Sequence, residues 1–129
     1  MKKEEIKTNH APAAIGPYSQ AVRAGRFIFL SGQIPIEPST GEIASGGAGA
    51  QTRQVLRNLQ SVLEAAGGTL NNIVKTTVYL KDISNLQEMN SAYAEFFKAP
   101  YPARATIEAA RLPKNVEIEI EAVAVVGEK

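Results

Sequence analysis

The stretch 116–126 near the C-terminus constrains the fold of this chain more than any other part of its sequence. Every second residue from Val116 to Ala124 is apolar, which predicts a strand with one face suited to a layer of helices. The opposite face begins with Glu117, Glu119 and Glu121 and ends with Val123 and Val125. Two valines do not suit a face that meets only water, and three glutamates do not suit a closed core. We therefore expect a second copy of the chain to cover this face, with the carboxylates at the rim or in a cleft.

Two amphipathic helices are predicted from apolar residues that recur at helical spacing. The first apolar stripe spans 55–66, and Gly67-Gly68 stops the helix. The second stripe spans 86–97, with Ser84 and Gln87 as a capping box and a proline three residues after the stripe as terminator.

Strands are predicted where β-branched, aromatic or alternating residues occur, at 18–24, 26–31, 74–80, 104–108 and 116–126, with a short one near 5–8. The strand 26–31 contains Phe27-Ile28-Phe29-Leu30, apolar on both sides, so we expect it to be central and covered on both faces. The segment 35–49 is expected to be a loop. This order of elements predicts an α+β fold, a mixed sheet with both helices on one face, in a single domain spanning 1–129.

The residue inventory excludes several kinds of chemistry. The chain has no cysteine and one histidine, His10, so thiol nucleophiles, disulfides and sites rich in His or Cys ligands are ruled out. No Walker lysine follows the glycines at 46–49, which argues against a phosphate-binding loop. We therefore expect neither a metal ion nor a cofactor.

Charge and hydropathy limit the partners. The formal net charge is +1 and no basic block is longer than Lys2-Lys3, which gives little support for electrostatic recognition of nucleic acid. No stretch approaches the ~20 apolar residues of a membrane-spanning helix. The charged segment 1–7 has no apolar core after it, so no signal peptide is predicted and a cytoplasmic location is expected.

Arg104 is the main candidate for binding an anion. It opens a short strand of small and apolar residues, so its guanidinium is not expected to be merely solvated. The planar guanidinium suits a bidentate carboxylate or phosphate. The alternative is a structural ion pair with a glutamate of the last strand. Glu119 would face the same part of the sheet as Arg104 if strands 104–108 and 116–126 pair across the turn at 112–115.

Other candidate residues carry weaker signals. Glu119 by itself could be an ordinary outward-facing glutamate. Ser31-Gly32 ends the central strand at a glycine, where a backbone N–H could meet a ligand, although loop geometry explains the glycine equally well. Tyr18 and Asn90 are unremarkable alone, because an asparagine within a helix is usually a surface residue. The residues alone therefore indicate an anion-binding cleft and no particular reaction.

Several motifs in a fixed order resemble the RidA (reactive intermediate deaminase, or YjgF) family. The N-terminal motifs are Gly16-Pro17-Tyr18-Ser19-Gln20-Ala21 and Leu30-Ser31-Gly32-Gln33-Ile34-Pro35. The C-terminal motifs are Pro102-Ala103-Arg104-Ala105-Thr106, Leu112-Pro113 and Ile118-Glu119-Ile120-Glu121-Ala122. The matching segments between them are Asn58-Leu59, Lys75-Thr76-Thr77-Val78-Tyr79-Leu80 and Asn90-Ser91-Ala92-Tyr93. The resemblance covers essentially the whole chain.

The resemblance implies a chorismate-mutase-like α+β fold that forms a homotrimer around a central barrel of sheets, with three clefts between subunits. It implies hydrolysis of enamine and imine intermediates, such as 2-iminopropanoate and 2-iminobutanoate, to 2-oxo acids and ammonia. Arg104 would bind the substrate carboxylate, and Glu119 would orient the attacking water and transfer protons.

The resemblance also implies which other residues line the cleft, namely Tyr18, Ser31, Gly32 and Asn90. Thr106 stands where many members of the family have a cysteine, and we expect it to contact the substrate as well. This departure puts thiol-dependent chemistry or regulation in doubt and leaves deamination as the expected reaction.

Two other functions stay open. Some members of the family are described as translation inhibitors with ribonuclease activity, which the near-neutral charge and the single histidine of this chain disfavour. The other alternative is a non-catalytic trimer that binds a small metabolite. The presence of both Arg104 and Glu119 disfavours that alternative.

Overall fold

The computed structural model describes residues 2–127, which form six strands, two α-helices and three short 3₁₀ helices. In chain order these elements are β1 (Lys3–Ile6), β2 (Ala21–Ala24), β3 (Phe27–Gln33), α1 (Gly47–Ala65), η1 (Leu70–Asn72), β4 (Ile73–Leu80), η2 (Ile83–Asn85), α2 (Leu86–Tyr93), β5 (Ala103–Glu108), η3 (Pro113–Asn115) and β6 (Ile118–Val125).

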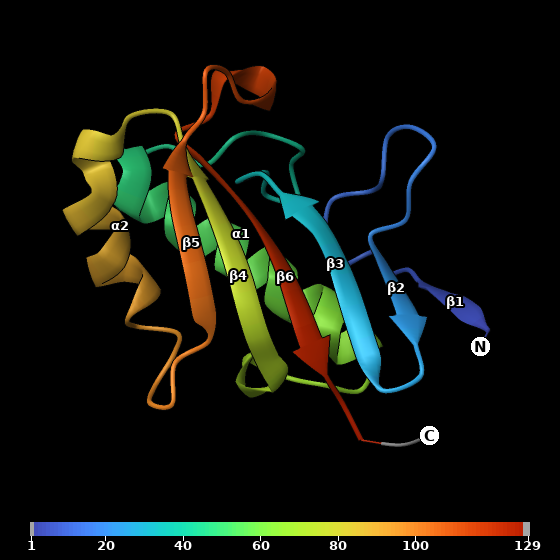
Figure 1. Cartoon of the computed structure of the whole chain (residues 1–129). Helices are drawn as coiled ribbons and strands as arrows, with labels where there is room; N and C mark the ends of the chain where they lie inside the picture. The colour runs from blue at the N-terminus through green and yellow to red at the C-terminus, as the bar shows by residue number, and fades with distance from the viewer. Residues whose placement is uncertain (1, 128–129) are drawn as a thin grey trace.

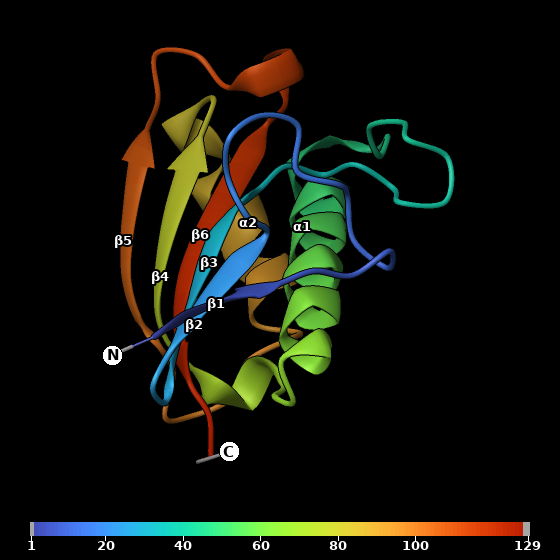
Figure 2. The same cartoon turned by 90° about the vertical axis from the view of Figure 1, so that its right-hand side faces the viewer.

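The strands form one mixed sheet in the order β1-β2-β3-β6-β4-β5. β4 and β5 run parallel, and every other neighbouring pair is antiparallel. Both helices lie on the same side of the sheet, with α2 near the β5 edge (Figure 1), and the edge-on view in Figure 2 separates the sheet from the helical layer. The predicted α+β fold is confirmed, and the N-terminal strand lies about two residues earlier than predicted.

The hydrophobic core lies between the sheet and α1. The apolar stripe of α1 is fully buried at Val55, Leu56, Leu59, Val62 and Leu63. Buried side chains of the sheet meet this stripe, among them Ile28, Val78, Ile118 and Ile120. The apolar face predicted for the last strand is therefore the face that packs on the helices. Within residues 2–127, no helix has the length and apolar character that crossing a membrane requires.

The side of the sheet without helices is here called the open face. It carries Phe27, Phe29, Tyr79, Glu119, Glu121, Val123 and Val125. β3 lies between β2 and β6, so its predicted central position is confirmed. Phe27 and Phe29 are each 49% exposed, so within a single chain only the helical face of β3 is covered.

Strands 104–108 and 116–126, whose pairing would place Glu119 beside Arg104, do not pair, because β4 lies between them. On one side, Thr76 of β4 stands opposite Arg104 of β5, and on the other side, Tyr79 of β4 stands opposite Glu119 of β6. The crossover through α2 returns the chain as a parallel strand at the outer edge of β4. β6 then pairs with the inner edge of β4 in the antiparallel direction.

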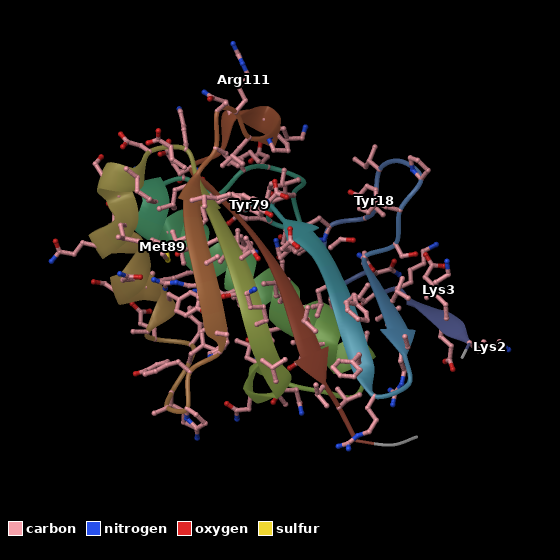
Figure 3. The ribbon with its side chains drawn as sticks, viewed as in Figure 1. Lys2, Lys3, Tyr18, Tyr79, Met89 and Arg111 are labelled. Carbon is pink, nitrogen blue, oxygen red and sulfur yellow. The ribbon has the colours of Figure 1, made fainter. Side chains whose placement is uncertain are left out.

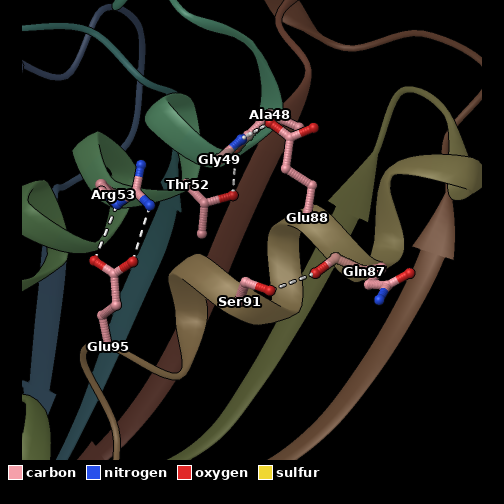
Figure 4. A network of polar contacts seen from close by, with 8 residues as sticks. All are labelled: Ala48, Gly49, Thr52, Arg53, Gln87, Glu88, Ser91 and Glu95. Atoms are coloured by element: carbon pink, nitrogen blue, oxygen red, sulfur yellow. Dashed lines mark hydrogen bonds and ion pairs between the residues drawn. The ribbon is translucent and has the colours of Figure 1, made fainter.

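Helix α1 begins within the segment 35–49 that was expected to be a loop. Its first turn depends on α2, because Glu88 Oε2 accepts a hydrogen bond from the Gly49 N–H at 2.7 Å (Figure 4). A Cβ at position 49 would stand 3.2 Å from that oxygen, so glycine permits the close approach. Arg53 of α1 and Glu95, in the turn after α2, form a bidentate pair at 3.0 and 2.9 Å. A tertiary contact therefore satisfies one of the free N–H groups at the start of the helix.

Helix α2 also differs from its prediction at both ends. The 3₁₀ helix before it is capped by Asp82, whose Oδ1 accepts from the Ser84 N–H at 2.9 Å, so Ser84 is not the capping residue expected. The α-helix ends at Tyr93, although the apolar stripe continues to the buried Phe97. The stripe predicted the buried side chains correctly and overestimated the length of regular helix.

Candidate active site

Arg104 lies on β5, the edge strand beside α2. It stands opposite Thr76 in the parallel register, and both side chains point to the helical side of the sheet. The Arg104 Cζ lies 4.9 Å from the centre of the Tyr93 ring of α2. Arg104 and Tyr93 line a cavity of about 320 Å³, here called the Arg104 cavity, together with Asn90, Ala94, Tyr101 and Pro102.

No carboxylate within residues 2–127 forms a salt bridge with Arg104. The structural alternative, an ion pair with a glutamate of the last strand, is therefore not formed in this chain. Asn90 also lines this cavity, and its Oδ1 is buried with no hydrogen-bond partner in the described part of the chain. A guanidinium without an acidic partner suits a ligand with a carboxylate.

Thr106 lies two residues beyond Arg104 on β5 and is half-buried. Its partner in the parallel register is Val78, a core residue, so Thr106 shares the helical side of the sheet with Arg104. Arg104, Thr106 and Asn90 are thus the three predicted site residues that belong to the region around the Arg104 cavity.

Glu119 lies on the open face, on the other side of the sheet from Arg104. It is half-buried and packs against Gly32 of β3. A Cβ at position 32 would overlap the Glu119 carboxylate, whose Cδ stands 3.0 Å from the place of that Cβ. The register of β3 against β6 shifts between Leu30 and Gln33, so a bulge brings the backbone of Gly32 to the carboxylate. Glycine at position 32 therefore leaves room for the Glu119 carboxylate against the β3 backbone, and a Cβ there would push that side chain aside.

The surroundings of Glu119 favour its protonated form. Burial raises the pKa of the Glu119 carboxyl above its ordinary value, and the negative charge of Glu121 raises it further. Tyr79, which stands opposite Glu119, donates a hydrogen bond from its hydroxyl to Glu121 Oε1 at 2.8 Å. A raised pKa lets this carboxyl hold a proton more readily than an ordinary glutamate does.

The raised pKa predicts how stability depends on pH. Folded Glu119 keeps its proton to a higher pH than the unfolded chain does, so the free energy of unfolding falls as pH rises from the unfolded pKa through the folded one. Glu119→Gln cannot titrate. We expect the melting temperature of this variant to exceed that of the wild type at pH 7. The difference should shrink as pH approaches the ordinary glutamate value of about 4.3. Thermal unfolding at one protein concentration measures it, and a difference independent of pH would contradict it.

Ser31 and Tyr18 complete the set of predicted site residues. Ser31 precedes Gly32 on β3, and its hydroxyl donates to the Ser19 carbonyl at 2.6 Å, which ties β3 to the segment before β2. Tyr18 lies in that segment, at the far side of the sheet from β5, and its ring is half-exposed (Figure 3). Its hydroxyl accepts a hydrogen bond from the Ile15 N–H at 3.3 Å.

The predicted residues therefore form two groups within one chain. Asn90, Arg104 and Thr106 lie on the helical side at the β5 edge, whereas Glu119, Ser31, Gly32 and Tyr18 belong to the region of β3, β6 and the segment before β2. The two groups are separated by the sheet itself. Glu119 and Arg104 would face the same part of the sheet only if their strands paired, and within a single chain they do not.

Known proteins resemble this chain over nearly its whole length. Residues 8–126 match the family model described as Endoribonuclease L-PSP. The chain is 57% identical over 122 residues to a RutC family protein of Pyrococcus horikoshii, a match that covers 95% of this chain and 97% of that protein. It is 52% identical over 123 residues to the 2-iminobutanoate/2-iminopropanoate deaminase of Escherichia coli, covering 93% and 95% of the two chains.

The crystal structure of the YjgF gene product from E. coli matches this structure with a TM-score of 0.91 and 50% identity, covering 95% of this chain and 98% of that one. This chain belongs to the RidA/YjgF family. The relatives carry different names, since one is called a deaminase, one a RutC family protein and the family model an endoribonuclease. Membership of the RidA/YjgF family therefore does not by itself assign a reaction to this chain.

Two features of this RidA-family site were missed from the sequence. Tyr93 was given no role at the site, yet its ring contacts the Arg104 guanidinium. The spacing of Asn90 and Tyr93, three residues apart in a helix, was an available signal that both share one face. The contact of Tyr79 with Glu121 had no such signal, because it depends on the register between β4 and β6.

Proposed function

We propose that this chain hydrolyses 2-imino acids, such as 2-iminopropanoate and 2-iminobutanoate, to the 2-oxo acid and ammonia. The observation that carries the proposal is the Arg104 guanidinium, which lines a cavity and forms no salt bridge with any carboxylate of residues 2–127. A 2-imino acid offers a carboxylate to this cation. The deaminase name of the E. coli relative supports the same substrate class.

The proposed chemistry uses one water and no cofactor. The imine carbon is electrophilic, so a water oriented by the Glu119 carboxylate attacks it while Glu119 accepts a proton. Glu119 returns that proton to the imine nitrogen, which gives a neutral tetrahedral carbinolamine. Glu119 then takes the proton of the carbinolamine hydroxyl and delivers it to nitrogen, so the C=O bond forms as the C–N bond breaks and ammonia leaves. Arg104 holds the substrate carboxylate throughout. The raised pKa of Glu119 suits a group that takes a proton in one step and returns it in the next.

The proposal requires Arg104 of one copy to meet Glu119 of another, because the sheet separates them within a chain. We propose a homotrimer with its sites between subunits and a central barrel formed by the open faces. Apolar side chains on the open face support this assembly. Phe27 and Phe29 are each 49% exposed in the single chain, and Val123 and Val125 lie beside them on β6.

The assembly can be tested by sedimentation. We expect a single species of three times the chain mass of 13.8 kDa. Phe29→Glu places a charge in the middle of the open face, so we expect it to release monomers and to abolish imine hydrolysis. A monodisperse wild-type monomer at micromolar concentration would contradict both the trimer and the shared site.

The description of the family model as an endoribonuclease makes RNA cleavage the alternative to test. RNA-binding proteins use basic surfaces and exposed aromatic side chains, whereas this chain has a net charge of +1. Within residues 2–127, no group of three or more His, Cys, Asp or Glu side chains could hold a metal ion.

The third possibility, a trimer that only binds a metabolite, predicts affinity for a 2-oxo acid without turnover.

One coupled assay separates the three functions. A threonine dehydratase generates 2-iminobutanoate, and the decay of the imine is followed with and without this protein, beside a labelled RNA substrate. We expect faster imine decay, intact RNA and the same rate after dialysis against a chelator. Acceleration that disappears on chelation and returns with a divalent ion would overturn the cofactor-free mechanism. RNA cleavage without imine hydrolysis would overturn the proposed function.

A further inference from the structure

The guanidinium of Arg104 contacts an aromatic ring and, within residues 2–127, pairs with no acid. Its Cζ lies over the Tyr93 ring at 4.9 Å from the ring centre, within the range of a cation–π contact. An acidic partner would also hold a guanidinium, but it would occupy the N–H donors and compete with a substrate carboxylate. A ring attracts the cation through its face and leaves the N–H donors free. Contact with a ring instead of an acid therefore leaves the Arg104 guanidinium free to bind an anion.

The Tyr93 ring is itself held from two sides. Its hydroxyl forms a 2.8 Å hydrogen bond with the hydroxyl of Thr76, which is fully buried on β4. Its ring packs against Phe97 with 4.5 Å between the ring centres, and only 5% of Tyr93 is exposed. Thr76 stands directly opposite Arg104 in the β4–β5 register. Arg104 and Thr76, the residue that anchors the Tyr93 ring, are therefore paired positions on neighbouring strands.

We propose that Tyr93 is a positioning residue that presets the direction of the Arg104 guanidinium and keeps its N–H donors available to the substrate carboxylate. The inference rests on the proposed function, since it concerns the same cavity. Asn90 lies one helical turn before Tyr93 and lines the same cavity. Tyr93 therefore orients the Arg104 guanidinium through the face of its ring. The ligand binds in the cavity beside Asn90.

The test compares Tyr93→Leu, which removes the ring, with Tyr93→Phe, which keeps the ring and loses the bond to Thr76. The probes are equilibrium binding of 2-oxobutanoate and steady-state hydrolysis of 2-iminobutanoate. We expect Tyr93→Leu to raise both Kd and KM by roughly 3- to 30-fold with a much smaller change in kcat. Tyr93→Phe should stay within about threefold of the wild type, because a phenyl ring also attracts a cation.

A ring of altered electron density tests the inference without changing the packing. A phenylalanine fluorinated at all five ring positions, introduced at position 93, keeps the size of the ring and reverses the attraction of its face for a cation. We expect it to bind 2-oxobutanoate more weakly than Tyr93→Phe does. This variant also decides the matter if Tyr93→Leu fails to fold. Equal affinity of the fluorinated variant and Tyr93→Phe would overturn the role of the ring.

A double-mutant comparison ties the effect to Arg104. In the Arg104→Ala background, Tyr93→Leu should not weaken 2-oxobutanoate binding further, because the ring acts through the arginine. An undiminished effect in that background would overturn the positioning role. If the proposed function fails, the wild type does not hydrolyse imines at all. If only this inference fails, the wild type is active and substitution of Tyr93 changes neither Kd nor KM.

Discussion

Arg104→Ala is expected to lower kcat/KM for 2-iminobutanoate by about two to four decades and to leave the fold intact. Hydrogen bonds to a charged group contribute roughly 1.5–3 kcal/mol each, and a bidentate pair supplies two of them. Arg104 is exposed on the edge strand β5 and forms no salt bridge within residues 2–127, so its loss should affect stability little. Steady-state kinetics and thermal unfolding, measured on the same preparation, test both parts.

Two further variants sharpen the Arg104 experiment. Arg104→Lys keeps the charge but has no planar fork, so it should also be strongly impaired. Arg111→Ala removes an exposed arginine of the loop after β5 (Figure 3) and should retain the activity of the wild type. If Arg104→Ala instead unfolded the protein while the remaining folded fraction kept its specific activity, Arg104 would be a structural residue.

Glu119→Gln is expected to lose most turnover while keeping the trimer and the affinity for a 2-oxo acid. General acid–base groups contribute about 10²- to 10⁴-fold to a rate, and glutamine can hold a water but cannot take its proton. The kcat should therefore fall by that factor, with little change in the Kd for 2-oxobutanoate. Sedimentation, binding and imine hydrolysis on one preparation separate loss of chemistry from loss of assembly.

Glu117→Gln is the matched control for Glu119. Glu117 precedes β6, and its carboxylate lies 3.8 Å from the Lys81 ammonium and accepts a 3.4 Å hydrogen bond from Asn85. It has no part in the proposed mechanism, so its variant should stay within a small factor of the wild-type rate. Equal rates for wild type, Glu117→Gln and Glu119→Gln would remove Glu119 from the mechanism and leave a binding cleft anchored by Arg104.

The sequence determined the features that depend on local periodicity. The helical stripes of α1 and α2, the stop at Gly67 and the alternation of the last strand all follow from residues a few positions apart. The two-sided character of β6, apolar towards the helices and mixed on the open face, was also predictable, because side chains of a strand alternate between its faces. Arg104 stood out for a similar reason, as a cation among small and apolar neighbours.

Tertiary structure alone decided how these features are combined. β4 separates β5 from β6, because strand pairing joins segments far apart in the chain and periodicity does not specify a partner. The start of α1 depends on Glu88, 39 residues beyond Gly49, and the support of Arg104 depends on where α2 sets Tyr93. The sheet order also places Arg104 and Glu119 on opposite faces. Alternation determines that each strand has two faces, and only the packed sheet determines which side chains share one.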